Sequence, residues 1–408
     1  MDKMAGRLVV VGAGQAAFAL AAKLRMLKDT RPITVLGSEP VLPYQRPPLS
    51  KKYLLGEMSF DRLLFRPEAW YAENDVEIRL STPVEAIDRD SRSVKLFDGS
   101  EIAYETLALA TGATPRRLPS AIGGDLEGVF TVRDKADADR LATEMKPGHR
   151  LLIIGGGYIG LEAAAVARKL GLDVTLIEMA DRILARVAAP QTADAIRAIH
   201  AAEGVQIFEK TGLARLIGDE GRVKAAELSD GRVIDADMVI VGIGVTPNDR
   251  LAGDAGLEVQ NGIVVDSFGR TSDPAIFAMG DCAVQDWKGQ QVRLESVQNA
   301  VDQAEAVAAV LAGGSEPYRP EPWFWSDQYD VKLQIAGFNL GYDETVVRPG
   351  ARDGSLSIWY FHAGDFIAVD AINDAKAYVT GKKLLDMERS VDRATIADPA
   401  LDLKTLIA

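Results

Sequence analysis

Two kinds of hydrophobic period follow each other at the start of the chain. Residues 7–11 are apolar and β-branched, which predicts a buried strand. A glycine turn at 12–14 leads into the alanine-rich stretch 15–28, which predicts a helix, and residues 32–36 predict a second strand. Strand, turn, helix and strand in this order predict a βαβ unit.

The same order of elements returns near residue 150. Residues 150–154 predict a strand, 155–157 a glycine turn, 158–170 a helix and 173–177 another strand. Because each βαβ unit of this kind is half of a dinucleotide-binding fold, the internal duplication is the most informative feature of the pattern.

Shorter alternating segments predict the remaining strands. They fall at residues 76–80, 93–97, 106–113, 203–210, 223–235 and 238–248. Residues 250–320 add two short strands and a long helix that begins near Gln298, and we expect them to return to the first domain. From Trp323 onward, strands at 331–338, 356–361 and 366–372 and a following helix predict a small α+β domain.

We therefore predict an α/β fold with two Rossmann-like dinucleotide-binding domains and a small C-terminal α+β domain. The first domain is expected to be discontinuous, with residues 1–113 and 250–320. The second is expected at 114–249 and the C-terminal domain at 321–408.

Composition and charge narrow the classes of function. The 408 residues carry a formal net charge of −13, which argues against a nucleic acid or an anionic membrane as the main partner. The single cysteine, Cys282, excludes an intramolecular disulfide, a CxxC redox pair and a cysteine-based zinc site. His149, His200 and His362 lack metal-ligand spacing, so we expect structural or surface roles for them and no metal site.

The N-terminus and the apolar runs bear on location. The chain passes from a charged start directly into a strand, without the apolar region of a signal peptide. No apolar run approaches the roughly 18 residues that span a bilayer. We expect a cytoplasmic protein.

The first glycine turn has the form GxGxxA, with Gly12, Gly14 and Ala17 at its key positions. Glycines there let the backbone approach a pyrophosphate, and the helix N-terminus supplies amide donors. Glu39, after the second strand, is placed to accept hydrogen bonds from a ribose diol. Ordinary tight-turn and surface roles are the alternatives.

The second turn matches GxGxxG in full, with Gly155, Gly157 and Gly160. Glu178 closes the following strand, and a carboxylate there suits a free 2′-hydroxyl and repels a 2′-phosphate, which favours NADH over NADPH. Arg182 lies close behind and would weaken that preference if it turned toward the ribose, but we expect it to be a surface helix charge.

Two dinucleotide sites in one chain suggest FAD and NAD, because hydride transfer needs a donor ring and an acceptor ring together. The motifs VVVGAGQAAFALAAKL, PYQRPPLSKKYL, LALATGATPR, IIGGGYIGLEAAAVA, VIVGIGVTPN, IFAMGDCA and ESVQNAVDQA cover most of the chain. With them, the sequence resembles the FAD-dependent pyridine-nucleotide reductases of glutathione-reductase-like fold. It is most similar to the NADH:ferredoxin reductases of the putidaredoxin reductase type, which PYQRPPLSKKYL and PWFWSDQYD single out.

The resemblance implies FAD in the first domain. In that site Gly12, Gly14 and Ala17 hold the pyrophosphate and Glu39 the ribose. Arg46 and Lys51 lie on the loop leading to the flavin, and Asp281 accepts from the ribityl chain, with a helix N-cap as its alternative role. The other implied FAD residues are Thr111 and Gly112, where the chain leaves the domain, and Glu295 and Val297, at a helix N-terminus that faces the flavin pyrimidine.

On the nicotinamide side, the resemblance implies that Gly155, Gly157, Gly160 and Glu178 bind NAD. Glu162 would reach toward the nicotinamide and Lys51, although a first-turn glutamate favoured by the helix dipole is its alternative role. Trp325 would lie near the flavin on the electron-exit side, or else form interface core with Trp323 and Phe324. Lys51, Glu162 and Trp325 are thus the expected catalytic residues.

The implied partner is a small iron-sulfur ferredoxin, expected to be of the two-iron type, that feeds a monooxygenase or a ring-hydroxylating dioxygenase. The protein is expected to be a monomer or a weak dimer, and Arg66 and Lys332 are candidate docking cations. A disulfide reductase would need a cysteine pair, and an NADH oxidase would need a redox cysteine within 43–51, where there is none. A flavoprotein with a signalling or interaction role remains an alternative.

Overall fold

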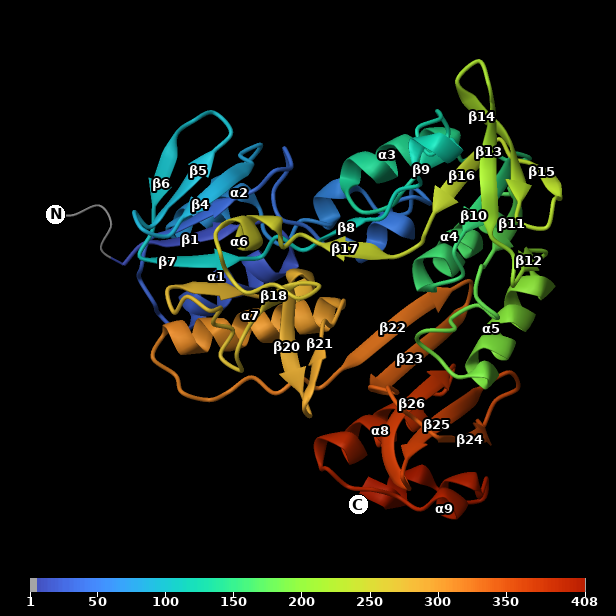
Figure 1. Ribbon diagram of the computed structural model, residues 1–408. Helices are drawn as coiled ribbons and strands as arrows, with labels where there is room; N and C mark the ends of the chain where they lie inside the picture. Colours follow the sequence, from blue (N-terminus) through green and yellow to red (C-terminus); the bar gives the residue numbers. More distant parts are fainter. Residues whose placement is uncertain (1–5, 408) are drawn as a thin grey trace. The chain divides into compact units, whose positions relative to one another are not determined.

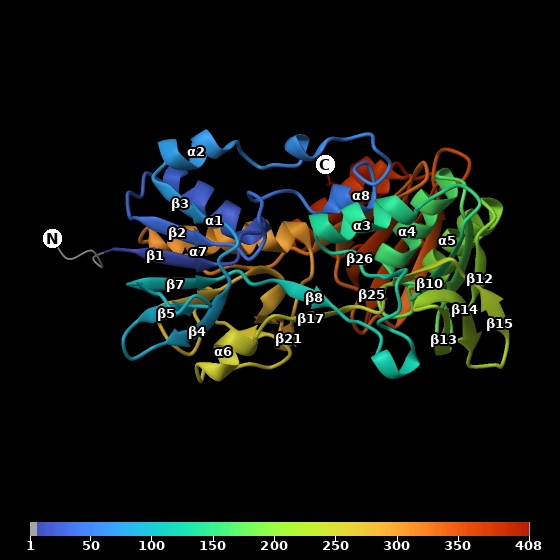
Figure 2. The same cartoon turned by 90° about the horizontal axis from the view of Figure 1, so that it is seen from above.

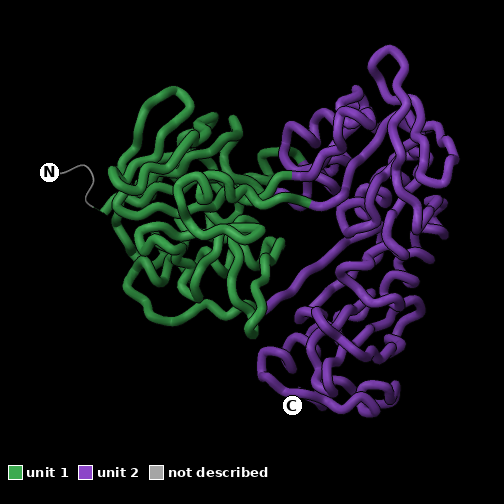
Figure 3. The backbone as a smooth tube through the Cα atoms, in the orientation of Figure 1, with its two compact units in different colours: residues 1–45, 59–114, 245–320 green, residues 46–58, 115–244, 321–408 purple. Residues whose placement is uncertain are grey.

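The computed structural model describes residues 6–407, and the chain divides into two compact units (Figure 3). Unit 1 comprises the segment ending at Gln45, Ser59–Thr114 and Val245–Pro320. Unit 2 comprises Arg46–Met58, Pro115–Gly244 and the segment from Glu321 onward. The C-terminal region and residues 46–58 thus group with the second βαβ unit, and the three predicted domain boundaries stay a prediction.

Unit 1 is built on a five-stranded parallel sheet of order β19-β7-β1-β2-β3, of which β1 and β7 are labelled in Figure 1. The strands are β1 (Leu8–Val11), β2 (Ile33–Leu36), β3 (Val76–Arg79), β7 (Thr106–Leu109) and β19 (Ile276–Ala278). Both faces of β1 are buried, because Leu8 and Val10 pack with α1 (Gln15–Met26) and α7 (Val297–Leu311) while Val9 and Val11 pack on the other face. That second face is covered by β4 (Val84–Asp88), β5 (Ser93–Leu96) and β6 (Glu101–Ala103), and Figure 2 shows β4 and β5 on this side of the sheet.

Smaller elements complete unit 1. They are η2 (Phe60–Arg62), α2 (Glu68–Glu73), β8 (Ala113–Pro115, ending in unit 2), β17 (Val245–Pro247), α6 (Arg250–Asp254), β18 (Ile263–Val264), η4 (Gly280–Cys282), β20 (Ala283–Trp287) and β21 (Gln290–Val292).

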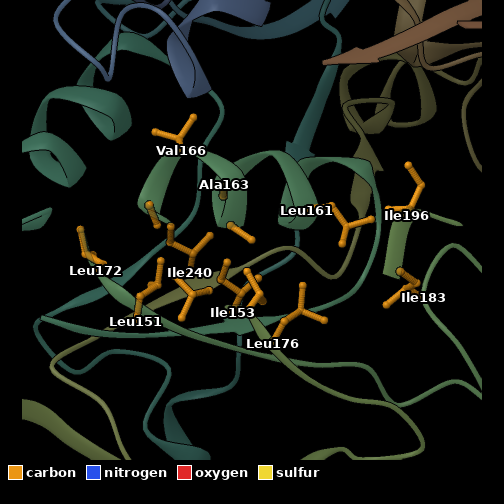
Figure 4. Close-up of a cluster of buried hydrophobic side chains, with 14 of the residues drawn as sticks. Leu151, Ile153, Leu161, Ala163, Val166, Leu172, Leu176, Ile183, Ile196 and Ile240 are labelled. Atoms are coloured by element: carbon orange, nitrogen blue, oxygen red, sulfur yellow. The ribbon is translucent and has the colours of Figure 1, made fainter. Parts of the chain in front are cut away.

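Unit 2 repeats the arrangement with a five-stranded parallel sheet of order β12-β11-β10-β16-β9. The strands are β9 (Val129–Phe130), β10 (Arg150–Ile154), β11 (Asp173–Ile177), β12 (Gln206–Phe208) and β16 (Met238–Val241), and the helices are α3 (Lys135–Glu144), α4 (Tyr158–Lys169) and α5 (Pro190–Ala202). Leu151 and Ile153 of β10 pack beneath α4 (Figure 4), while Leu152 and Ile154 face β13 (Leu213–Asp219), β14 (Arg222–Leu228) and β15 (Val233–Asp235). The predicted duplication is therefore confirmed in strand order as well as in sequence. Unit 2 also contains η1 (Pro47–Ser50) and η3 (Ser120–Ile122).

The C-terminal part of unit 2 is an antiparallel sheet of order β22-β23-β26-β25-β24 with short helices, as the predicted α+β class requires. Its elements are β22 (Trp323–Gln328), β23 (Val331–Gly337), β24 (Glu344–Pro349), β25 (Leu356–His362), β26 (Asp365–Ile372), α8 (Ala375–Asp386), α9 (Arg393–Ala397) and η5 (Leu403–Ile407). The sequence patterns did not predict β22 and β24. In β22 the polar residues Ser326 and Gln328 are buried, so hydrophobic alternation does not mark the strand.

Helix ends differ slightly from the prediction. The first helix ends at Met26 rather than residue 28, because Lys28 adopts a left-handed conformation with φ of 61°. Among residues 6–407, no helix is long and apolar enough to cross a membrane.

Candidate functional site

The glycine turn of unit 1 is determined by close backbone packing. Gly12 has φ of +106°, and a Cβ there would lie 2.2 Å from the carbonyl oxygen of Ala110, so only glycine fits. Gly14 is the N-cap of α1, and a Cβ there would meet no heavy atom of residues 6–407 within 4 Å. Ala17 is fully buried against the sheet. The turn therefore presents open space before the helix amides, which suits a phosphate group.

Glu39 lies beyond β2, in the same unit as this turn. Its Oε2 accepts a hydrogen bond of 2.7 Å from the hydroxyl of Tyr44. The predicted ribose ligand thus already has one side-chain donor that holds its carboxylate, and its contact with a ribose stays a prediction.

The turn of unit 2 repeats this geometry. Gly155 has φ of +107°, and a Cβ there would lie 2.3 Å from the carbonyl oxygen of Gly242. A Cβ at Gly160 would lie 2.2 Å from the carbonyl oxygen of Gly155, so glycine allows the helix to pack tightly on the turn. Gly157 is the N-cap of α4 and, like Gly14, faces space that no described residue fills within 4 Å of a Cβ. Both turns fit the pyrophosphate of a dinucleotide.

Glu178 is positioned directly at this second turn. Its Oε2 accepts from the amide of Gly156 and its Oε1 from the amide of Ala180, each at 2.7 Å. The expectation that Arg182 is a surface helix charge is wrong. Arg182 lies in the loop between β11 and α5, and its guanidinium donates to the carbonyls of Ile183 and Ala188 at 3.3 and 2.7 Å.

Lys51 and Glu162 form a mostly buried ion pair within unit 2. Nζ of Lys51, just after η1, lies 3.0 Å from Oε1 of Glu162, and only 18% and 8% of the two side chains is exposed. Burial raises the pKa of Glu162, while Lys51 and the hydroxyl of Ser326 oppose that shift. Glu162 is the fifth residue of α4, so its alternative role as a first-turn dipole glutamate is wrong. The resemblance predicted this pairing, and the structure brings the two residues together.

Ser326 is a site residue that the sequence reasoning missed. Its Oγ donates to Oε1 of Glu162 at 2.7 Å. Phe324, two positions earlier on the same face of β22, has its ring 4.9 Å from that of Tyr158. Trp325 therefore points to the opposite face, where its ring lies 5.5 Å from that of Trp323. The signal that was available is the period-two placement of Phe324, Ser326 and Gln328.

The remaining predicted FAD residues of unit 1 cluster around two turns. The hydroxyl of Thr111 donates to the carbonyl of Asn248 at 2.7 Å, and the backbone N–H of Asn248 donates to the carbonyl of Gly112 at 2.9 Å. These two bonds hold the segment that follows β7 against Asn248. Asp281 lies inside η4 and is followed by β20, so its alternative role as a helix N-cap is wrong. Its carbonyl accepts from Arg293 at 3.1 Å.

Glu295 and Val297 lie at the start of α7. Val297 is the first helical residue, and the N-cap Ser296 accepts from the amide of Asn299. Glu295 pairs with Arg293 at 2.6 Å. The structure thus places a capped helix N-terminus where the resemblance expects one.

A buried polar network in unit 1 supports these turns and was not predicted. Gln303 accepts from the amide of Gly280 at 2.8 Å and donates to Gln285 at 3.1 Å, and Gln285 donates to Asn299 at 3.3 Å. Asn299 and Gln303 are spaced i, i+4 on the apolar face of α7, and that spacing is the signal that the sequence analysis overlooked.

Arg46, Lys51 and Trp325 belong to unit 2, whereas the other predicted FAD residues belong to unit 1. Arg46 precedes η1 and donates to the carbonyl of Arg133 at 3.0 Å. The candidate docking cations are both exposed. Arg66 of unit 1 lies 5.7 Å from the ring centroid of Phe18, and Lys332 of unit 2 lies in β23.

The cysteine and the histidines have the environments expected of structural or surface residues. Cys282 is buried, and its thiol donates to the carbonyls of Met279 and Leu109. His200 is fully buried between Gln328 and Tyr329, His149 is half-buried, and His362 is exposed. Within residues 6–407, no group of His, Cys, Asp and Glu side chains could hold a metal ion.

Comparison with known proteins identifies the family. Residues 6–304 match the model of the pyridine nucleotide-disulphide oxidoreductases, and residues 323–407 match the reductase C-terminal model. The chain is 43% identical to a ferredoxin–NAD(P)(+) reductase of Sphingomonas sp. over 98% of its own length and 97% of that protein. It is also 43% identical to the rhodocoxin reductase of Rhodococcus erythropolis, over 98% and 94% of the two chains.

Solved structures agree with this assignment. The chain aligns with a TM-score of 0.96 and 37% identity to the reductase in a covalent putidaredoxin reductase–putidaredoxin complex, covering 99% of each chain. The resemblance stated from the motifs is therefore confirmed. This chain belongs to the pyridine nucleotide-disulphide oxidoreductase family and ends in a reductase C-terminal domain.

Proposed function

We propose that this chain is an FAD-dependent NADH:ferredoxin oxidoreductase that supplies electrons to an oxygenase through a small iron-sulfur protein. The carrying observation is the pair of glycine turns, each opening onto unfilled space before a helix N-terminus, in a chain that has one cysteine. Full-length similarity to ferredoxin reductases supports the same conclusion.

The residues of unit 1 suit the FAD adenylate and ribityl groups. The amides before α1 and the small residues Gly12, Gly14 and Ala17 accommodate a pyrophosphate, and Glu39 accepts from the ribose. Asp281 accepts from ribityl hydroxyls, and the N-terminus of α7 at Val297 stabilises negative charge on the pyrimidine side. Thr111, Gly112 and Glu295 complete the set in unit 1, and the resemblance also assigns Arg46 and Trp325, which belong to unit 2, to FAD.

The residues of unit 2 suit NADH. Gly155, Gly157 and Gly160 shape the pyrophosphate site, and Glu178 lies where a 2′-phosphate would meet a carboxylate. FAD and NADH, when bound, supply the chemistry of hydride acceptance and the subsequent release of single electrons. The protein itself contributes alignment and electrostatics.

Lys51 and Glu162 do this electrostatic work. The Lys51 ammonium is assigned to stabilise the negative charge that develops on reduction, and Glu162 keeps that ammonium in place through the 3.0 Å contact. Because both side chains are mostly buried, the field of this pair is less screened than that of an exposed pair.

Other redox functions of the superfamily need reactive cysteines, and the single cysteine of this chain is buried. A dithiol reductase requires two cysteines, and the sequence has one. Burial raises the pKa of the Cys282 thiol, which opposes formation of the thiolate that a cysteine-based NADH oxidase or peroxidase uses. A signalling flavoprotein is distinguished by its turnover, which would be very slow.

The ferredoxin partner is supported by a related reductase that was solved joined to putidaredoxin. A two-iron cluster in the partner, a monomeric or weakly dimeric reductase and a cytoplasmic location complete the proposal.

The decisive experiment is titration of the purified protein with NADH, followed by transfer to ferredoxins. Acid should release a flavin that runs as FAD, NADH should bleach it, and a two-iron ferredoxin should be reduced in turn. Release of FMN, a flavin that stays attached after denaturation, or very slow turnover with every acceptor would contradict the proposal.

A further inference from the structure

A line of buried hydrogen-bonding side chains leads from Glu162 to α5 within unit 2. Ser326 donates to Glu162 at 2.7 Å, and Nε2 of Gln328 donates to Oγ of Ser326 at 3.0 Å. Oε1 of Gln328 then lies 2.8 Å from Nε2 of His200, and the hydroxyl of Tyr329 lies 3.2 Å from Nδ1 of the same ring. Ser326, Gln328 and His200 are each at most 1% exposed.

The direction in which these hydrogen bonds are donated follows from the number of hydrogens that each group carries. A serine hydroxyl has one hydrogen, so Ser326 donates to Glu162 while its lone pair accepts from Gln328. Gln328 donates with its amide nitrogen only if its carbonyl oxygen faces His200. If that amide were reversed, its oxygen would take the serine hydrogen, and Glu162 would lose its donor.

The orientation of Gln328 and the tautomer of His200 are coupled. Burial lowers the pKa of His200, so the ring is neutral and carries one N–H. Gln328 Oε1 requires that hydrogen on Nε2, which leaves Nδ1 to accept from Tyr329. Reversal of Gln328 would require the other tautomer of His200, with the hydrogen on Nδ1 facing the Tyr329 hydroxyl, and it would turn the Gln328 carbonyl oxygen toward the Ser326 hydroxyl.

We propose that Gln328 and His200 are positioning residues that hold the Ser326 hydroxyl as a donor to Glu162 and thereby orient the carboxylate of the Lys51–Glu162 pair. The inference rests on the proposed function, because it concerns the pair assigned to the nicotinamide. Oε1 of Glu162 pairs with the Lys51 ammonium and accepts the hydrogen bond from Ser326, whereas Oε2 accepts no hydrogen bond from residues 6–407. The orientation therefore leaves Oε2 for an N–H donor of the bound nicotinamide.

This row of hydrogen bonds positions Glu162 and does not conduct protons. A side-chain amide passes a proton only through an unfavourable tautomer, so Gln328 interrupts proton transfer between Ser326 and His200. The charged groups that act on Glu162 are Lys51 and Asp327, and neither belongs to the chain of hydrogen bonds.

The test replaces Gln328 with Met, which keeps the length and removes both hydrogen bonds. Without Gln328 the Ser326 hydroxyl is free to rotate away from Glu162, so the pKa of Glu162 is expected to rise and both pH profiles to move to higher pH, since a hydrogen bond to an ionised group stabilises the ionised form. Two measurements report the pKa of Glu162: the pH profile of flavin reduction by NADH, and the pH dependence of the NAD⁺ dissociation constant measured by calorimetry. His200→Leu should produce the same shift, and His200→Gln, which keeps an N–H donor, should restore most of the wild-type profile.

Ser357→Ala is the matched control. Ser357 is buried and accepts from Nε1 of Trp359 at 3.0 Å, away from Glu162, so this variant should lower the Tm without moving either pH profile. If Gln328→Met and His200→Leu lower the Tm but leave both profiles unchanged, the proposal is wrong. Should Gln328→Met not fold, Gln328→Leu, which is uncharged and also lacks both hydrogen-bonding groups, decides by the same profiles. A wild-type protein that binds no FAD or is not reduced by NADH would overturn the proposed function instead.

Discussion

Oε2 of Glu178 accepts a hydrogen bond of 2.7 Å from the amide of Gly156, so the residue that follows β11 also holds the glycine turn before α4. The carboxylate that is expected to read the ribose therefore helps to shape the pyrophosphate site. Substitution at Glu178 should affect both cofactor choice and overall affinity.

Wild-type protein should prefer NADH over NADPH, because Glu178 repels a 2′-phosphate. A discrimination of roughly 2–4 kcal/mol is expected from the repulsion and the lost polar contact. Glu178→Ala should narrow the ratio of the two kcat/KM values while lowering both, because the turn also loses its acceptor. Glu203→Ala, at an exposed position, is the control. Wild-type preference for NADPH would contradict the assignment of the second site.

Lys51→Met should destabilise the protein more than the double variant Lys51→Met, Glu162→Gln. The single change leaves a buried carboxylate without its cation, at a cost of about 3 kcal/mol, and neutralising Glu162 removes that cost. Denaturant unfolding of wild type, both single variants and the double variant gives the coupling between the two residues. Both single variants should also slow flavin reduction by NADH at least about tenfold. If Lys51→Met and the double variant have equal free energies of unfolding, Lys51 and Glu162 are not energetically coupled.

Asp370→Asn should gain stability relative to wild type as the pH rises from about 4 to 7. Burial raises the pKa of Asp370 to about 6, although Tyr360 and Thr192 donate to Oδ2, and Oδ1 has no hydrogen-bond partner among the described residues. A carboxyl whose folded-state pKa is raised stabilises the fold fully below its unfolded pKa of 3.8, and this contribution is lost as the pH rises through 6. The loss is on the order of 2–3 kcal/mol. Tm values of both proteins across this range test it, and parallel curves would show that Asp370 does not titrate there.

Arg66→Glu or Lys332→Glu should slow ferredoxin reduction and leave NADH-to-ferricyanide turnover nearly intact. A net-negative reductase needs a local positive surface to meet an acidic ferredoxin, and both residues are exposed cations. The wild-type rate with ferredoxin should fall with salt, because exposed charges are screened. Lys404→Glu, at another exposed lysine, is the control. If both activities fall together, or if neither reversal nor salt changes ferredoxin reduction, the docking assignment is wrong.

The fold class and the two glycine turns could be predicted from the sequence because their causes are local. Strand and helix periods act over a few residues, and the backbone conformations of Gly12 and Gly155, with φ of +106° and +107°, are ones that other residues rarely adopt. The motifs around them identified the family and implied the Lys51–Glu162 pair. Helix ends and the polar strand β22 were less predictable, since capping and buried hydrogen bonds override the hydrophobic pattern.

What only the tertiary structure decided is which distant side chains satisfy the buried polar groups. Glu162 and Ser326 are 164 positions apart, and His200 and Gln328 are 128 apart, yet each pair shares a hydrogen bond. Arg182 likewise turns to the carbonyls of its own loop rather than to solvent on a helix. A buried polar atom forms a hydrogen bond with whichever partner the fold brings near, and the neighbouring residues in the sequence do not identify that partner.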